Sequence, residues 1–203
     1  MRIIAGELKG RKLHSPSGDR IRPTSDKVKG AIFSMIGAYV GEAAVLDVFS
    51  GSGNLGLEAL SRGASRCRFC DNSRESVALI KKNVAVCGVE SRAEVFLGDF
   101  RKALSEPGSR ADVIFLDPPY REGHYPECMA LIRDKGTLKS GGIVVAEHDC
   151  GVELPDVAGF VKIKTKRYGG TGVTLLREDE GAATRGEDEK APVFGAPSEG
   201  EGG

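Results

Sequence analysis

Residues 45–56 read Val-Leu-Asp-Val-Phe-Ser-Gly-Ser-Gly-Asn-Leu-Gly, and this stretch decides the fold. An apolar run of the kind found in buried strands leads into a glycine-rich turn, and a helical pattern starts directly after it. Gly51, Gly53 and Gly56 have the spacing of a nucleotide-binding loop, where glycine permits a tight turn and a close approach of backbone to ligand. The stretch predicts a nucleotide-type cofactor at the carboxyl end of a parallel strand.

The rest of the chain alternates short apolar runs with helical patterns. Strands are expected at 44–49, 67–70, 93–97, 113–116 and 143–146, and helices at 54–62, 73–87 and about 126–135. This alternation of strands and helices predicts a parallel sheet with helices on both faces. Two further runs, 160–167 and 172–177, predict a closing antiparallel hairpin. The expected fold class is therefore α/β and Rossmann-like, with seven mostly parallel strands.

Acidic residues follow three successive strands of this sheet. Asp47 precedes Gly51 by four residues, where a carboxylate would repel a pyrophosphate and attract an amine, which favours S-adenosylmethionine (SAM) over NAD. Asp71 is placed to accept hydrogen bonds from ribose hydroxyls, and Asp99 or its neighbouring amide to meet an adenine edge. Each acid alone is more often a helix cap or a surface residue than a ligand-binding residue. Together they predict a nucleoside site.

The motif Asp117-Pro118-Pro119-Tyr120 follows the apolar run 113–116. Two prolines fix the backbone and remove two amide donors, so the Asp117 carboxylate and the Pro118 carbonyl remain as acceptors. Such a pair suits the exocyclic NH2 of a nucleobase, because two acceptors favour a pyramidal nitrogen whose lone pair can attack a methyl group. Tyr120 offers a ring for stacking a flipped base, worth about 1–3 kcal/mol. The bland alternative is a proline-rich turn capped by Asp117.

The charges balance at 29 basic and 29 acidic residues, but they are unevenly distributed. Residues 1–30 hold eight basic and three acidic side chains, which suggests a polyanionic partner, although a solvated surface would look the same. Residues 178–203 hold eight acidic and two basic side chains, with few large apolar ones, which predicts a disordered acidic tail. Such a tail is either a lineage-specific addition or a competitor for the basic face.

Several classes of protein are excluded or disfavoured by composition. No apolar run approaches the roughly 20 residues of a membrane helix, and the first ten residues lack a signal-peptide core, so we expect a cytoplasmic protein without a membrane partner. Five cysteines, an odd number, also favour a reducing compartment. Cys67 and Cys70 have half of a metal-binding pattern, but they lie on an expected strand and no second pair follows, so no metal is expected.

Four separated motifs, in order, carry a resemblance to a known family. They are Arg2-Ile3-Ile4-Ala5-Gly6 with Gly10-Arg11-Lys12-Leu13; Arg22-Pro23-Thr24 with Asp26, Val28 and Phe33; Phe49-Ser50-Gly51-Ser52-Gly53 with residues 56–64; and Asp117-Pro118-Pro119-Tyr120. Over residues 1–177 the chain resembles the RsmD family, the bacterial 16S rRNA (guanine-N2) methyltransferases. These are class I SAM-dependent enzymes.

The resemblance implies methylation of a guanine N2 amine in 16S rRNA, either naked or in a partly assembled 30S subunit, by a monomer that uses SAM and releases S-adenosylhomocysteine. The implied cofactor-binding residues are Asp47, Phe49, Gly51, Ser52, Gly53, Asp71, Asp99, Arg22 and Thr24. Asp117, Pro118 and Tyr120 would hold the target guanine, and Lys9, Arg11 and Lys12 would contact rRNA. The expected organisation is an rRNA-contacting hairpin and helix (1–40), a methyltransferase domain (41–177) and the tail (178–203).

Other functions stay open at this point. The Asp-Pro-Pro-Tyr motif does not distinguish amines, so adenine N6 in DNA or rRNA is an alternative target. A glutamine-directed protein methyltransferase would leave the basic hairpin unexplained. A ribosome-assembly factor with dispensable catalysis belongs to a different class, and a nicotinamide dehydrogenase remains the interpretation of the glycine loop taken alone.

Overall fold

The computed structural model describes residues 1–15, 25–118, 123–179 and 181. In chain order the elements are α1 (Asp26–Val40), β1 (Ala44–Asp47), α2 (Asn54–Ser61), β2 (Arg66–Asp71), α3 (Arg74–Cys87), the 3-10 turn η1 (Glu90–Arg92), β3 (Ala93–Leu97), α4 (Phe100–Ser105), β4 (Ala111–Leu116), α5 (Tyr125–Lys135), β5 (Leu138–Asp149), β6 (Phe160–Tyr168) and β7 (Thr171–Glu178). Among the described residues, no helix has the length and apolarity needed to cross a bilayer.

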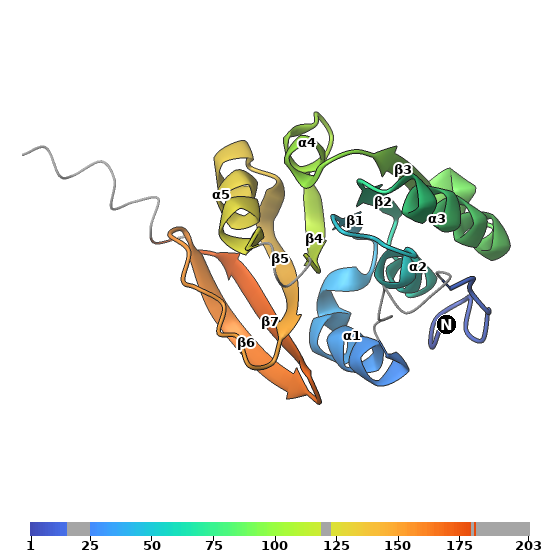
Figure 1. The fold of residues 1–203 in the computed structure, drawn as a ribbon, viewed down its shortest axis with the longest axis horizontal. Helices are drawn as coiled ribbons and strands as arrows, with labels where there is room; N and C mark the ends of the chain where they lie inside the picture. Colours follow the sequence, from blue (N-terminus) through green and yellow to red (C-terminus); the bar gives the residue numbers. More distant parts are fainter. Residues whose placement is uncertain (16–24, 119–122, 180, 182–203) are drawn as a thin grey trace, which may run out of the picture.

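The strands form one seven-stranded sheet in the order β3-β2-β1-β4-β5-β7-β6, as Figure 1 shows. Pairings among β1 to β5 are parallel, whereas β7 pairs antiparallel with both β5 and β6. This topology confirms the predicted α/β class and its closing hairpin. The chain reverses its direction of progress between β1 and β4, and such a switch point opens a crevice beyond the carboxyl ends of the strands.

Alternate strand residues face two separate apolar cores. Helices α1, α2 and α3 cover one face, where Val45, Phe69 and Phe115 point, and α4 and α5 cover the other, where Leu46 and Ile114 point. Because both faces are covered, β1 is buried along its whole length. Each side chain of β1 is therefore fixed by packing, and so is the point at which the strand delivers the glycine turn.

The N-terminal segment adds a short hairpin to the α1–α3 face. Arg2 and Lys12 form an isolated antiparallel bridge, and Ile3 and Leu13 are buried in the same core as α1. Gly6 has φ 82°, and a Cβ there would lie 1.8 Å from the Ser61 carbonyl oxygen, so only glycine allows this approach to α2. The expected hairpin and helix of residues 1–40 thus share one core with the main domain.

Some boundaries differ from those expected. Helix α4 has only six residues and was not expected at all, and β5 begins at Leu138, ahead of the apolar run at 143–146. Strand β7 continues to Glu178, and the Asp179 amide donates to the Gly159 carbonyl, so the first residues of the expected tail belong to the folded sheet. From residue 182 on, the tail lies outside the described residues. All five cysteines are free thiols.

Candidate active site

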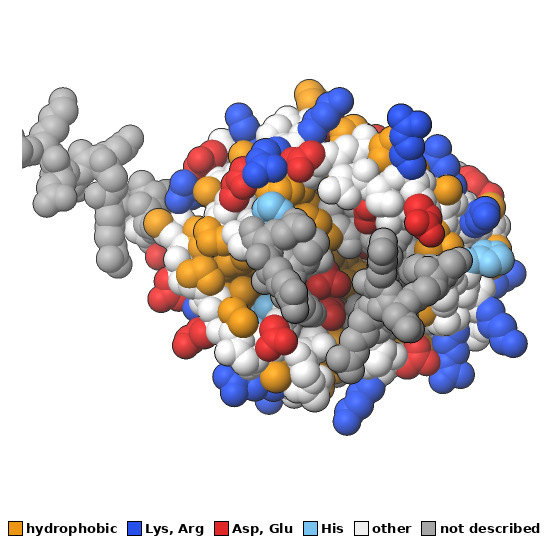
Figure 2. Space-filling model, in the orientation of Figure 1, with side chains coloured by type: hydrophobic (Ala, Val, Ile, Leu, Met, Phe, Trp, Pro, Cys, Tyr) orange, Lys and Arg blue, Asp and Glu red, His pale blue; other side chains and the backbone are white. Residues whose placement is uncertain are grey.

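The candidate site lies at the switch point, beyond the carboxyl ends of β1 and β4. Asp47 is the last residue of β1, and Asp117 directly follows β4, which pairs with β1. Figure 2 shows acidic side chains in a hollow near the middle of the molecule's face, while Lys and Arg side chains lie mainly around the rim. The site therefore concentrates negative charge at the place where an open α/β sheet binds its ligand.

The glycine turn after β1 is held by neighbouring strands. Gly51 and Gly53 have φ values of 55° and 78°, which favour glycine. The Gly51 amide donates to the Asp71 carboxylate at 2.9 Å, and Ser50 Oγ donates to the Asp47 carbonyl at 2.7 Å. A Cβ on Gly51 would meet nothing within 4 Å, so this side of the turn is open to a ligand. The loop is thus positioned before any ligand arrives.

Asp47 carries the most constrained carboxylate of the glycine loop. It is 3% exposed, and one oxygen accepts the Gly56 amide at 3.1 Å. Burial, with a smaller contribution from the Asp71 charge, raises the pKa of Asp47 to about 7. Among the described residues, no Lys or Arg forms an ion pair with this carboxylate. A cationic ligand would therefore lower the cost of its ionisation.

Asp117 lies in the same acidic group. Removal from water, together with the Glu147 and Asp47 charges, raises the pKa of Asp117 well above its usual range. Glu147 is buried in β5, beside β4 in the sheet. Such crowding of carboxylates destabilises the fold. Because strongly shifted pKa values cluster at functional sites, Asp117 is a candidate functional residue. The raised pKa favours the protonated form of Asp117, and a cation in the site would favour the ionised form that accepts hydrogen bonds.

Asp99 takes the helix-cap role that its sequence position also allowed. Its carboxylate accepts the Arg101 amide at 2.9 Å at the start of α4. Next to it, the Phe100 ring packs against Phe49 at 5.6 Å and His124 at 4.9 Å between centroids. Arg101 covers the Phe100 ring at 4.4 Å. The loop after β3 thus joins an aromatic cluster that includes the predicted cofactor residue Phe49, and the adenine role of Asp99 stays a prediction.

The structure distributes the other predicted residues as follows. One carboxylate oxygen of Asp71 accepts the Gly51 amide and the other accepts the Ser73 amide, both at 2.9 Å. Each oxygen retains a lone pair that could accept a ribose hydroxyl. Pro118 is half-buried beside Asp117. Arg22, Thr24 and Tyr120 lie outside the described residues. The three predicted RNA-contacting residues, Lys9, Arg11 and Lys12, are exposed on the hairpin.

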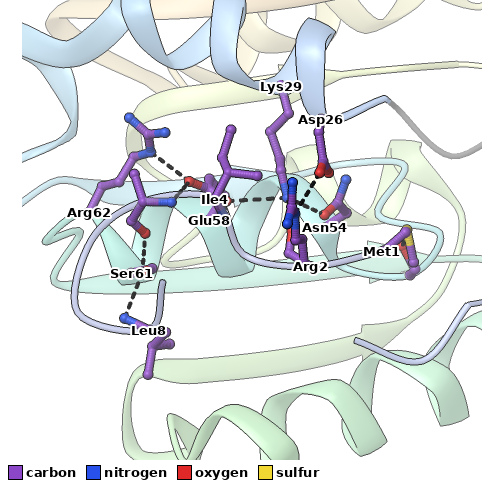
Figure 3. A network of polar contacts seen from close by, with 12 residues as sticks. Met1, Arg2, Ile4, Leu8, Asp26, Lys29, Asn54, Glu58, Ser61 and Arg62 are labelled. Carbon is purple, nitrogen blue, oxygen red and sulfur yellow. Dashed lines mark hydrogen bonds and ion pairs between the residues drawn. The ribbon is translucent and has the colours of Figure 1, made fainter. Parts of the chain in front are cut away.

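A buried ion-pair network connects the hairpin to α1 and α2 (Figure 3), and sequence reasoning did not find it. Lys29 and Glu58, both 0% exposed, approach to 3.2 Å, and Arg62 adds a second ion pair to Glu58 at 2.8 Å. Glu58 also accepts the amides of Ile4 and Ala5 at 2.8 and 3.0 Å. The available signal was Glu58 as the one acidic residue among the apolar residues of the helix expected at 54–62.

Two buried amide side chains continue this network to the glycine loop. Lys29 Nζ donates to the Arg2 carbonyl at 2.5 Å and to Asn54 Oδ1 at 2.7 Å, at the first residue of α2. Asn83 Nδ2 donates to the carbonyls of His14 and Ser52 at 3.1 and 2.9 Å. The hairpin and the glycine turn are therefore held by common partners, which separate sequence motifs do not reveal.

The residues present fit SAM better than a dinucleotide or a metal. SAM carries a sulfonium and an ammonium group, and the Asp47 and Asp117 carboxylates, with raised pKa values, would be stabilised by positive charge. A pyrophosphate would add negative charge to the same group. Within the described part of the chain, no cluster of three His, Cys, Asp or Glu side chains is suited to a metal ion.

Comparisons with known proteins identify the family and the fold. A family model described as "Conserved hypothetical protein 95" matches residues 1–177. The chain is 42% identical over 184 residues to the Bacillus subtilis protein named "Putative rRNA methyltransferase YlbH", spanning 88% of this chain and 99% of that protein. It is 32% identical over 180 residues to "Ribosomal RNA small subunit methyltransferase D" of Escherichia coli, spanning 89% and 90%. A solved Escherichia coli structure, "Putative methyltransferase yhhF", has a TM-score of 0.79 at 33% identity and spans 88% of this chain and 98% of its own.

Proposed function

The chain belongs to the Conserved hypothetical protein 95 family and has the class I methyltransferase fold, and from this premise we infer that it is a SAM-dependent rRNA methyltransferase. We propose further that its target is the exocyclic N2 amine of a guanine in small-subunit (16S) rRNA. The observation that carries the proposal is the placement of two carboxylates at the switch point: Asp47 ends β1, and Asp117 directly follows the paired strand β4. Such a pair can serve a cationic methyl donor on one side and an amine on the other.

The cofactor supplies a methyl group on a positively charged sulfur. In the proposal, Asp47 and the turn at Gly51 and Gly53 hold its methionine part, while Asp71 holds the ribose. Asp99 and the Phe49–Phe100 cluster border the adenine end. Support comes from the prepositioned loop, which Asp71 and Ser50 fix without a ligand. A loop fixed in advance loses less entropy on binding.

The target amine is proposed to meet Asp117 and the Pro118 carbonyl. Both accept hydrogen bonds from the NH2 group, which turns the nitrogen lone pair away from the ring system and toward the methyl carbon. The N–C bond forms as the S–C bond breaks, and S-adenosylhomocysteine is released. The surplus proton leaves the nitrogen to Asp117 or to water, and the raised pKa of Asp117 makes this carboxylate a competent acceptor. The protein's contribution is mainly orientation and electrostatics.

The basic hairpin is proposed to bind the rRNA. Lys9, Arg11 and Lys12 are exposed and form no ion pair with any described acidic residue, so they are available for phosphates. Adenine N6 presents an NH2 group as well, and the contacts of Asp117 alone do not separate the two amines. The identity of the methylated base is therefore the readout that decides the finer proposal.

The test is methyl transfer from labelled SAM to unmodified 30S particles, naked 16S rRNA, 50S particles, tRNA and duplex DNA. Wild type is compared with Asp117→Asn, which preserves size and removes the charge. We expect label in small-subunit rRNA, recovered as N2-methylguanosine, and a loss of at least about a thousandfold in the variant. N6-methyladenosine, or label in another substrate, would overturn the target but keep the chemistry. No label at all with intact SAM binding would favour a non-catalytic assembly factor.

A further inference from the structure

A second charged feature lies at the opposite edge of the sheet from the candidate site. A groove of about 300 Å³ opens at the amino ends of four strands, where its lining includes Ala44, Ala93 and Ala111. Four arginines also line it: Arg66, Arg68, Arg92 and Arg110. Glu94 is the one acidic residue of the lining. We refer to this feature as the arginine groove.

The four arginines fall into two pairs with different roles. Arg68 donates to both oxygens of Glu94, at 2.8 and 2.9 Å, and also to Ser109 Oγ at 2.9 Å, so the fold uses all of its nitrogens. Arg92 pairs with Glu7 and donates to the Leu60 and Ala64 carbonyls. These two arginines build the walls of the groove. Their positive charge is largely neutralised.

Arg66 and Arg110 are different. Both are exposed, and neither forms an ion pair within 4 Å with an acidic residue of the described chain. Arg66 interacts electrostatically with Asp112, but that carboxylate already accepts hydrogen bonds from the Ala44 amide and Lys139 Nζ, each at 2.8 Å. The guanidinium groups of Arg66 and Arg110 therefore flank the groove with N–H donors available to a ligand. An anion with several oxygens is the ligand that matches them.

The basic hairpin leads from the candidate site to this groove. Residues 2–7 of the hairpin run alongside α2. Near the start of the helix, Lys29 Nζ donates to both the Arg2 carbonyl and Asn54 Oδ1. Further along, the Ile4 amide donates to Glu58 and the Glu7 amide donates to the Ser61 carbonyl. Helix α2 starts beside the glycine turn and ends toward the amino edge of the sheet. Accordingly, Glu7 at the hairpin's tip reaches Arg92 of the groove wall. The hairpin that carries Lys9, Arg11 and Lys12 is thus joined to the wall of the arginine groove.

We propose that the arginine groove binds the phosphate backbone of the RNA substrate at a second point, with Arg66 and Arg110 as its contacts. The inference rests on the proposed rRNA substrate and deepens it. Strands of four to six residues place the groove about 13–20 Å from the methyl-transfer site. Contacts at that distance do not read the target base. They orient a folded RNA or a ribosomal particle on the enzyme.

Phosphate binding by basic side chains has a quantitative signature. Removing one such side chain makes the slope of log affinity against log salt less steep by roughly 0.7–0.9. Replacing Arg66 and Arg110 together should therefore reduce the slope by about 1.5 and weaken RNA binding about ten- to thirtyfold near 0.1 M salt. The rate of methyl transfer at saturating RNA should not change, because neither residue lies near the carboxyl ends of the strands.

The experiment measures binding of unmodified 16S rRNA from 50 to 300 mM salt, together with single-turnover methyl transfer. Arg66→Ala/Arg110→Ala is compared with Lys164→Ala/Lys166→Ala, which removes the same charge from exposed positions of the edge strand β6. We expect the shallower slope in the groove variant only. Equal slopes for groove variant and wild type would overturn the groove and leave the methyltransferase intact, as would equal losses in both variants.

Two further outcomes are decisive. Wild-type protein that neither binds nor methylates rRNA would remove the proposed function, and the groove inference with it. The acidic residues 182–203 are a competing occupant, since Glu178 at the end of β7 interacts electrostatically with Arg110. If the groove binds this acidic segment instead of RNA, the groove variant binds RNA as tightly as wild type or more tightly. In chains ending at Gly181, proteins with and without the two arginine substitutions then bind RNA equally tightly. That result would overturn the proposal.

Discussion

Two groups of buried charge lie on either side of the glycine turn, and they are built in opposite ways. In the network of Lys29, Glu58 and Arg62, each charge has a counter-charge, and Glu58 also receives two backbone amides. In the acidic group of Asp47 and Asp117, carboxylates face other carboxylates, and their pKa values rise. Only the first group contains counter-charges within the fold. Even there, burial outweighs the attraction of Glu58 and lowers the pKa of Lys29.

The difference separates structure from function. A compensated buried ion pair holds elements together and requires nothing further. A group of like charges destabilises the empty protein, and its stabilisation comes from whatever binds there. The two groups should therefore respond to neutralisation with opposite signs. Stability should fall when a charge is removed from the network, and stay level or rise when one is removed from the acidic group.

The largest effect is expected from Lys29→Met. The substitution preserves chain length but leaves Glu58 buried with Arg62 as its remaining ion-pair partner, so the free energy of unfolding should fall by about 3–5 kcal/mol. Chemical denaturation measures this loss. The matched control is Arg2→Met, which breaks an exposed ion pair with Asp26 on the same helix and should cost less than about 1 kcal/mol. Equal losses in both variants would contradict the role assigned to burial.

The second effect concerns Asp47→Asn. The amide keeps an acceptor for the Gly56 amide and removes the buried charge, so stability at pH 8 should be unchanged or higher. Binding of SAM should weaken by about ten- to a hundredfold, because a hydrogen bond or ion contact to a charged group is worth about 1.5–3 kcal/mol. Calorimetric titration measures the affinity. A stable variant with unchanged SAM affinity would show that this carboxylate does not face the cofactor.

The pH dependence sharpens the same comparison. The pKa of Asp47 is about 7 in the folded protein and near 3.9 when unfolded, so its contribution to stability is present in full below about pH 4 and is lost as the pH rises through 7. Affinity for SAM should move the other way and rise about tenfold from pH 6 to pH 8, because the ionised form attracts the cation. Asp47→Asn should flatten both profiles. Parallel profiles for stability and affinity would be inconsistent with this assignment.

The smallest effect is expected at the surface. Ending the chain at Gly181 removes most of the acidic tail while keeping β7, and RNA affinity should rise a few-fold at 50 mM salt. At 300 mM salt the difference should disappear, because exposed charges are screened whereas the two buried groups are not. Filter binding at both salt concentrations measures it. An affinity that is unchanged at low salt means that the tail does not compete for the basic face.

The fold was largely predictable because its signals are local. Apolar runs of four to six residues mark the buried parallel strands, and Gly51 and Gly53 mark the turn that only glycine makes easily. Helix α4 was missed because six residues give too short a period to detect. The early start of β5 was missed because Lys139, Ser140 and Gly141 are polar, and its register with β4 shifts between Ala111 and Val113.

The site was predictable only in part, for a related reason. Asp47, Asp71 and Asp117 follow from one rule about strand ends, and the same rule applied to Glu147 would have found the residue that crowds Asp117. The pairing of Lys29 with Glu58 joins positions 29 residues apart, and that of Asn83 with His14 joins positions 69 apart. No local pattern encodes such contacts. Periodicity therefore finds the ligand-binding edge, but not the links between hairpin and loop.

The docking of the hairpin also has a consequence for the order of events during synthesis. The first fourteen residues leave the ribosome before their partners in α2 and α3, since Glu58, Ser61 and Asn83 all come later in the chain. At roughly 5–20 residues per second, several seconds pass before residue 83 has been made. Over that interval a basic segment with the apolar residues Ile3 and Leu13 is exposed next to the RNA of the ribosome that is synthesising the chain. The segment can dock fully on the domain only after α3, which carries Asn83, has been synthesised.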